Sequence, residues 1–141
     1  MIEFHFKDVE VPDLDPSSVA PWLIESIEKE GVRPGAINVI FVSDEFLYEM
    51  NCSYLNHDYY TDIITFDYGD DDCVIGDLFV SVDRLRDNAE TFGCEFNEEL
   101  LRVIIHGILH LCGYKDKSDD EIILMRMKEN EYLRAYVSRE T

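Results

Sequence analysis

Residues 97–116 read NEELLRVIIHGILHLCGYKD, and this stretch determines what kind of domain the sequence encodes. Asn97 is a residue type that favours helix N-termini, and apolar side chains then occur on most sides of the helix predicted over 98–112. Gly113 is suited to end that helix, because glycine readily adopts the left-handed conformation found there. A helix that is apolar on most sides is buried, so we expect this segment to lie in the core.

Two histidines interrupt the apolar pattern of this helix. His106 and His110 are four residues apart, which places them about 40° apart around a helix axis, so both imidazoles can reach one metal ion. Asp116 follows the turn at Gly113 and can approach the pair from the loop. Two histidines and one carboxylate leave the fourth position of a tetrahedral zinc ion open, as in catalytic sites. We therefore predict one Zn²⁺ per chain, bound by His106, His110 and Asp116.

The patterns around this helix predict one α+β domain over residues 1–141. Alternating or β-branched runs indicate strands at 1–9, 37–42, 63–66 and 74–82, the last two forming a hairpin. Four further helices are predicted: one capped by Ser17 or Ser18 and closed by Gly31, and others over about 44–54, 83–93 and 119–137. Four strands and about five helices make an α+β domain, in which the metal site lies at the C-terminal end of the buried helix.

Composition and charge narrow the classes of function. The chain has 141 residues, enough for one domain, and its 31 acidic against 12 basic residues give a net charge of −19. Such a surface repels nucleic acid on average, so an RNA substrate requires a local metal ion or basic groove. No window resembles a membrane span or a signal peptide, which predicts a cytoplasmic protein without a membrane partner. The four cysteines form no CxxC pair, and no motif indicates a small-molecule cofactor.

The histidine spacing also occurs in metzincin proteases, which makes a metalloprotease one alternative. Those enzymes need a glutamate directly after the first histidine as the general base, and here that position is Gly107. Met125 and Met127 lie inside a predicted helix, so we expect them to be core residues and not a Met-turn. Peptide hydrolysis would need an acidic residue supplied from elsewhere in the chain.

The chain resembles the YbeY family of bacterial rRNA maturation factors, which are metal-dependent single-strand endoribonucleases. The family motif H-G-x-L-H-L-x-G-Y-D-H is matched by His106, Gly107, Leu109, His110, Leu111, Gly113 and Tyr114. A second family stretch is matched by Asn51, Tyr54, Asp58, Thr61, Asp62 and Phe66, and a third by Gly76 and Asp77. The resemblance implies a mixed four-stranded sheet with helices around it, one zinc ion, and a role in ribosome biogenesis.

The sequence departs from the family pattern at positions that bear on chemistry. Asp116 stands where the family has its third histidine, and Leu55 and His57 stand where it has an arginine and a lysine. An aspartate in the ligand set lowers the net charge of the site from +2 to +1, which makes a bound water less acidic. The loss of two cations predicts fewer phosphate contacts with RNA.

From these residues we predict metal-assisted hydrolysis of single-stranded RNA in the maturation of small-subunit rRNA. The catalytic candidates are His106, as a metal ligand, with Asp62 or His57 as a proton-transferring group. The expected partners are ribosomal RNA, the small ribosomal subunit and assembly factors. The chief alternative is a ribosome-assembly factor with little or no cleavage activity, in which zinc only stabilises the fold.

Overall fold

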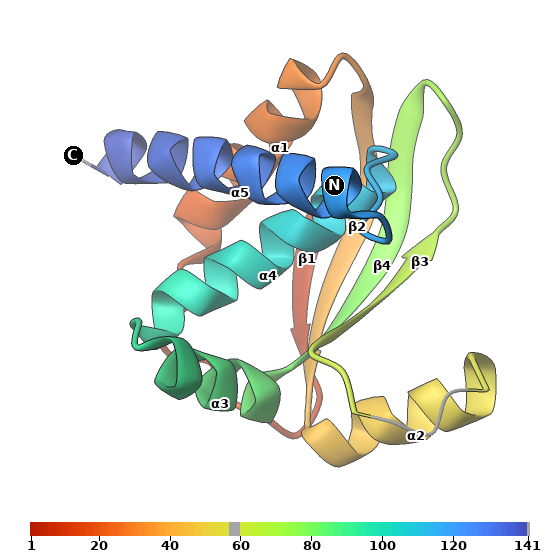
Figure 1. Cartoon of the computed structure of the whole chain (residues 1–141), viewed down its shortest axis with the longest axis vertical. Coiled ribbons are helices and arrows are strands. Elements are labelled where there is room, and N and C mark those ends of the chain that lie inside the picture. Colours follow the sequence, from red (N-terminus) through yellow and green to blue (C-terminus); the bar gives the residue numbers. More distant parts are fainter. Residues whose placement is uncertain (57–59, 141) are drawn as a thin grey trace.

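A mixed four-stranded sheet forms the centre of the protein, as the sequence predicted (Figure 1). The computed structural model describes residues 1–56 and 60–140. Its strands are β1 (Ile2–Phe6), β2 (Arg33–Val42), β3 (Ile63–Asp67) and β4 (Cys73–Ser81). They lie in the order β1-β2-β4-β3, with β1 and β4 parallel to β2 and β3 antiparallel to β4. The predicted hairpin of the last two strands is confirmed.

Five helices surround the sheet, in agreement with the predicted number. They are α1 (Pro16–Lys29), α2 (Asp44–Tyr54), α3 (Val82–Phe92), α4 (Phe96–Leu111) and α5 (Asp119–Glu140). Figure 1 shows α4 lying across the sheet between α5 on one side and α3 on the other. None of the helices in the described part of the chain is long and apolar enough to cross a membrane.

Because apolar residues alternate along the strands, each face of the sheet packs into its own hydrophobic core. Val39 pairs with Leu78 and Phe41 with Val80, and all four side chains are fully buried in the main core with α1, α4 and α5. The opposite face carries a smaller cluster, in which α2 packs against the sheet: Val42, Leu47, Met50 and Ile64. Helix α4 is buried because the sheet covers one side of it and neighbouring helices cover others.

Two helix starts differ from their predictions by at least two residues. Helix α1 begins after Asp15, not after Ser17 or Ser18, and both serine hydroxyls donate to the Asp15 carboxylate, at 2.6 and 2.8 Å. Helix α4 begins after Glu95, two residues before the predicted cap at Asn97. Phe96 packs against the main core from the first position of α4, and this burial accounts for the longer helix.

Glycine lets the end of α4 approach the sheet closely. A Cβ atom at Gly76 in β4 would lie 2.5 Å from the backbone oxygen of Phe66 and 2.8 Å from a methyl group of Leu111, the last residue of α4. Gly107 lies against the sheet in the same way, because a Cβ there would be 2.7 Å from Ile63 and 3.0 Å from Leu78. Because neither glycine has a side chain, α4 can pack close to the strands.

We expect Gly76→Ala to destabilise the protein by about 1–3 kcal/mol, the usual cost of overpacking a core. The backbone oxygen of Phe66 cannot rotate away from the added methyl group as a flexible side chain could. Urea denaturation measures the effect as a lower unfolding midpoint at an unchanged slope. An unchanged midpoint would show that β4 does not constrain the position of α4 at this residue.

Candidate metal centre

The three predicted ligands converge on one point at the end of α4. The Nε2 atoms of His106 and His110 are 3.0 Å apart, and Asp116 Oδ2 lies 3.2 and 3.3 Å from them respectively. Ligand atoms of a tetrahedral zinc ion with bonds of 2.0–2.1 Å are about 3.3 Å apart. The spacing and the nitrogen and oxygen donors of this group, in which both histidines are half-buried, therefore fit one small divalent ion.

The hydrogen bonds of the two imidazoles give a second reason why a cation fits there. His106 Nδ1 lies 2.7 Å from Glu129 Oε2, and His110 Nδ1 lies 2.9 Å from the backbone oxygen of Tyr114. A carboxylate and a carbonyl oxygen only accept hydrogen bonds, so each Nδ1 carries the proton. In the neutral imidazoles both Nε2 lone pairs then point toward each other and toward Asp116. That arrangement is repulsive unless a proton or a metal ion lies between the three atoms.

Local backbone geometry brings Asp116 to the histidines. Gly113 has a φ of 108°, and the amide of Tyr114 donates to the carbonyl of Leu109 at 3.0 Å, which closes the end of α4. Tyr114 is also anchored at a distance, because its hydroxyl donates to Glu30 Oε1 at 2.7 Å. Glu30 follows α1, so this bond fixes the residue whose carbonyl orients His110.

The predicted capping box at the start of α5 limits which aspartates can reach the metal centre. Ser118 Oγ accepts from the amide of Glu121 at 3.2 Å, and the Glu121 carboxylate accepts from the amide of Ser118 at 2.9 Å. Asp119 and Asp120 therefore lie in the first turn of α5, where their charges favour the helix dipole.

Glu129 on α5 supports the centre from behind His106. Only 5 % of its side-chain surface is exposed. Arg102 donates to Glu129 Oε1 at 2.9 Å, and Arg126 lies 3.4 Å from the same oxygen. A carboxylate that holds the second nitrogen of a ligating histidine fixes its tautomer and ring orientation. Glu129 is therefore a positioning residue for His106.

The pKa values of His106 and Glu129 depend on their burial and on the hydrogen bond between them. Burial alone would lower the pKa of His106, but the hydrogen bond to Glu129 and the charges of Glu129, Asp116 and Asp62 outweigh it, so the pKa is raised. Burial alone would raise the pKa of Glu129, but the hydrogen bonds from His106 and Arg102 lower it. Glu129 is therefore ionised at neutral pH and strengthens the cation-binding character of His106.

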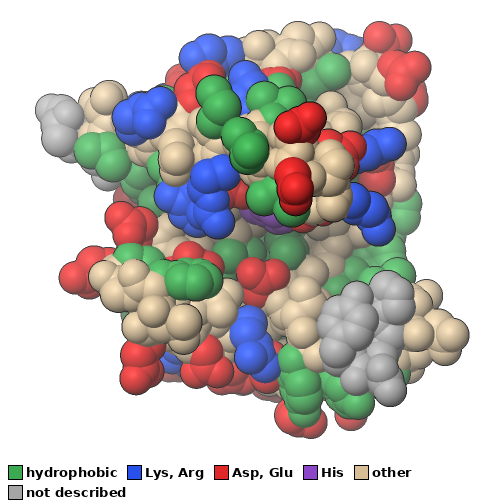
Figure 2. All heavy atoms as spheres, viewed as in Figure 1, with side chains coloured by type: hydrophobic (Ala, Val, Ile, Leu, Met, Phe, Trp, Pro, Cys, Tyr) green, Lys and Arg blue, Asp and Glu red, His purple; other side chains and the backbone are tan. Residues whose placement is uncertain are grey.

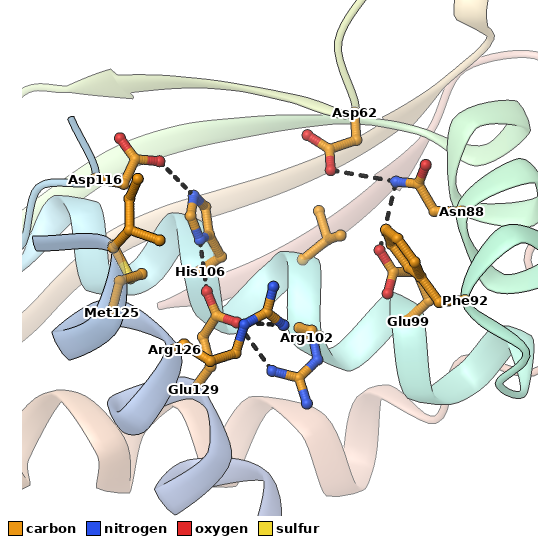
Figure 3. A pocket seen from close by; sticks show the side chains of 12 residues that line it. Asp62, Asn88, Phe92, Glu99, Arg102, His106, Asp116, Met125, Arg126 and Glu129 are labelled. Carbon is orange, nitrogen blue, oxygen red and sulfur yellow. Dashed lines mark hydrogen bonds and ion pairs between the residues drawn. The ribbon is translucent and has the colours of Figure 1, made fainter. Parts of the chain in front are cut away.

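A cavity of about 350 Å³ opens beside the centre, between α3, α4 and α5 (Figure 3). His106 and Asp116 lie at one end, and Asp62, Asn88 and Glu99 lie at the other. The Asn88 amide nitrogen is 3.4 Å from Asp62 Oδ2 and 3.4 Å from Glu99 Oε2, so one amide connects the two carboxyl groups. Burial raises the pKa of Asp62 and that of Glu99. Two proton-accepting groups thus line the cavity that leads to the metal ligands.

The other residues considered from the sequence fall in different places. His57 lies outside the described residues, so its role stays a prediction. Gly107 lies against the sheet, where no catalytic carboxylate could replace it. Met125 is buried as predicted, but Met127 is 61 % exposed on α5 and is not a core residue. Burial raises the pKa of Cys112 to about 12, so this thiol is protonated and a poor nucleophile.

The sequence prediction missed the residues that support the centre, namely Glu30, Asn88, Glu99, Arg102 and Glu129. One signal could have found two of them. Glu99, Arg102, His106 and His110 recur every three or four residues, which places one polar stripe along an otherwise apolar helix. No such signal exists for Glu129, because α5 carries many acidic residues of similar spacing.

The chain is an α+β domain in which two nitrogen ligands and one oxygen ligand lie beside a cavity and leave one coordination position open. This combination defines a candidate metal-dependent enzyme. The family model described as "Endoribonuclease YbeY" matches residues 1–137 of the chain, which therefore belongs to this family.

Similar proteins cover nearly the whole chain. Endoribonuclease YbeY of Parabacteroides distasonis is 48 % identical over 132 residues, which cover 94 % of this chain and 93 % of that protein. Its counterpart in Flavobacterium johnsoniae is 50 % identical over 131 residues, which cover 93 % and 94 %. The solution structure of TM1509 from Thermotoga maritima has a TM-score of 0.72 and 32 % identity, and the match covers 99 % of this chain and 91 % of that one.

We expect Glu129→Gln to lower Zn²⁺ affinity about 10- to 100-fold, the usual effect of losing such a support. Glutamine cannot offer His106 a charged acceptor and also satisfy Arg102. The matched control is Glu131→Gln on the same helix, which loses only ion pairs to Lys29 and Lys128. Competition with a chromophoric chelator measures both affinities. Equal affinities for the two variants would contradict the role of Glu129.

We expect Asp62→Asn to stabilise the metal-free protein at neutral pH. A carboxyl group whose pKa is raised in the folded state contributes stability that is lost as pH rises through that pKa. The gain from Asp62→Asn should therefore be small at acid pH and should grow toward neutral pH. Urea denaturation in a chelator at pH 4 and pH 8 measures it.

The control for this prediction is Asp72→Asn, which removes the same charge from an exposed turn. An equal gain in both variants would mean that relief of net charge, and not burial of Asp62, is the cause. A variant that is less stable than the parent at pH 8 would contradict the prediction outright.

Proposed function

We propose that the protein is a zinc-dependent endoribonuclease that cleaves single-stranded RNA, and in particular ribosomal RNA. The observation that carries this proposal is the convergence of His106 Nε2, His110 Nε2 and Asp116 Oδ2 within 3.0–3.3 Å in a chain of the YbeY family. Both Nδ1 atoms are engaged elsewhere, so the Nε2 atoms are available to bind an ion.

In the proposed reaction, the position of each side chain determines its role. His106, His110 and Asp116 would hold the ion, with Glu129 and the Tyr114 carbonyl orienting the two imidazoles. An ion bound there would supply Lewis-acid chemistry to a phosphoryl oxygen of the RNA. Asp62, which lines the same cavity and has a raised pKa, or His57 would accept the proton of the attacking water.

Basic residues near the centre support an RNA substrate in spite of the acidic chain. Lys115 and Lys117 are exposed on either side of Asp116 in the sequence, and neither forms an ion pair within the described residues. Arg126 lies on the cavity wall and is largely exposed. Figure 2 shows a small area of histidine surface at the edge of a hollow, with Lys or Arg side chains to its left and right and Asp or Glu side chains next to it. These cations would offset part of the repulsion between a phosphate backbone and the acidic surface.

The cellular role follows from the family and stays part of the proposal. We infer that residues 1–141 act as one YbeY-type domain in the maturation of small-subunit rRNA in the cytoplasm. The partners would then be the small ribosomal subunit and its assembly factors. No small-molecule cofactor is needed for this chemistry.

The proposal is tested by incubating the Zn²⁺-loaded protein with one RNA as a single strand and as a duplex. Cleavage of the single strand, its loss in chelator and its return with Zn²⁺ are the expected results. RNA that binds without being cut would instead favour a non-catalytic assembly factor. Digestion of casein with no effect on RNA would favour a protease.

We expect Asp116→Ala to abolish tight Zn²⁺ binding and RNA cleavage, whereas Asp119→Ala should leave both unchanged. Asp116 Oδ2 faces both Nε2 atoms, but Asp119 belongs to the first turn of α5. Asp116→His should retain the ion and, because the site becomes more positive, shift the pH–activity profile to lower pH. Isothermal titration of Zn²⁺ with a cleavage assay measures all three variants. An Asp116→Ala protein that holds Zn²⁺ as tightly as the parent would contradict the ligand assignment.

A further inference from the structure

An exposed aromatic ring stands at the edge of the cavity that contains the metal ligands. Val82, Leu85 and Ala89 form the buried stripe of α3, and Phe92 continues that stripe three residues further on. Phe92 nevertheless remains 67 % exposed, because it ends the helix over the cavity and not over the core. In the described part of the chain, no other aromatic ring stacks on it.

Phe92 lines the same cavity as the candidate metal ligands His106 and Asp116. Phe92 and Asn88 come from α3, and Arg126 comes from α5 (Figure 3). Helix α4 separates α3 from α5 and contributes His106 between them. A volume of about 350 Å³ lies in the range of small-ligand sites. The walls thus combine an apolar ring, amide and carboxyl groups, and a cation.

Arg126 is the cation that α5 contributes to the cavity wall. Glu129 is already hydrogen-bonded to Arg102 on one oxygen and to His106 on the other. Arg126 approaches the same carboxylate at 3.4 Å, and its side chain is 61 % exposed. Arg126 therefore presents a largely exposed guanidinium at the cavity, and the carboxylate that it pairs with is shared with Arg102 and His106.

We propose that Phe92 and Arg126 form a nucleotide subsite for single-stranded RNA, in which the Phe92 ring stacks on one base and Arg126 binds an adjacent phosphate. Aromatic stacking with cationic contacts to the backbone is the general mode of binding to single strands. A base in a duplex is covered by its neighbours, so this subsite selects unpaired nucleotides next to the metal ligands. The inference rests on the proposed function and specifies how the same site recognises its substrate.

The test of Phe92 measures binding of a labelled RNA oligonucleotide to metal-stripped protein, so that no cleavage occurs. Phe92→Leu keeps the apolar bulk but loses the ring, and should weaken binding about tenfold. Phe92→Tyr keeps the ring and should bind like the parent. Tyr68→Leu, at an exposed ring in the β3–β4 turn, is the matched control and should have no effect.

Oligonucleotides with one abasic residue show whether the ring contacts a base. At one position in the oligonucleotide, an abasic residue should weaken binding to the parent protein. The same abasic oligonucleotide should bind to the Phe92→Leu variant as tightly as intact RNA binds to that variant. If Phe92→Leu weakens every abasic oligonucleotide as much as the intact one, the ring does not stack on a base. If Phe92→Leu binds intact RNA like the parent, the proposal is overturned.

The test of Arg126 uses salt dependence. Arg126→Gln should weaken binding of all sequences and lower the slope of log affinity against log salt by about 0.7, the value for one phosphate contact on a single strand. Arg134→Gln is the control, because Arg134 is also exposed on α5 but lines no part of this cavity. Equal slopes for the two variants would overturn the phosphate contact.

The outcomes of these tests distinguish failure of the Phe92–Arg126 subsite from failure of the proposed function. A parent protein that cleaves single-stranded RNA while Phe92→Leu and Arg126→Gln bind normally would refute the subsite alone. A parent protein that neither binds nor cleaves RNA would refute both. RNA-independent binding of a protein partner that is lost in Phe92→Leu would assign the ring to a protein interface instead.

Discussion

The position of helix α4 on the sheet is the constraint on which the rest of the structure depends. Gly76 and Gly107 remove side chains where the helix meets the strands, so α4 lies close to β3 and β4. Its apolar residues are then buried around most of its circumference, and its polar stripe faces the cavity between α3 and α5. Both histidines are held on a rigid element, which is a requirement for a precise ligand geometry.

The metal centre illustrates how distant elements complete a local motif. The two imidazoles come from α4, but their orientation is set by Glu129 on α5 and by Tyr114, whose hydroxyl is held by Glu30 at the end of α1. Buried polar groups of this kind are stable only when each is hydrogen-bonded. The same supports leave two lone pairs and a carboxylate oxygen facing one another, which favours a cation at that point.

The sequence predicted the elements that depend on local chemistry and missed those that depend on packing between distant segments. The His106–Asp116 segment and the Ser118 capping box are local, and the structure has both as predicted. The predicted start of α4 was wrong because packing of Phe96 against the core outweighed the capping preference of Asn97. Glu129 follows His106 by 23 residues, and nothing in the sequence of α5 distinguishes it from its acidic neighbours.

The most direct measurement of the central claim is X-ray absorption spectroscopy of the Zn²⁺-loaded protein at the zinc edge. The structure predicts a first shell of nitrogen and oxygen atoms at about 2.0–2.1 Å, with the outer-shell scattering of two imidazole rings. A sulfur atom at about 2.3 Å would instead indicate a cysteine ligand such as Cys112. That result, or a shell without imidazole scattering, would contradict the assignment of His106, His110 and Asp116.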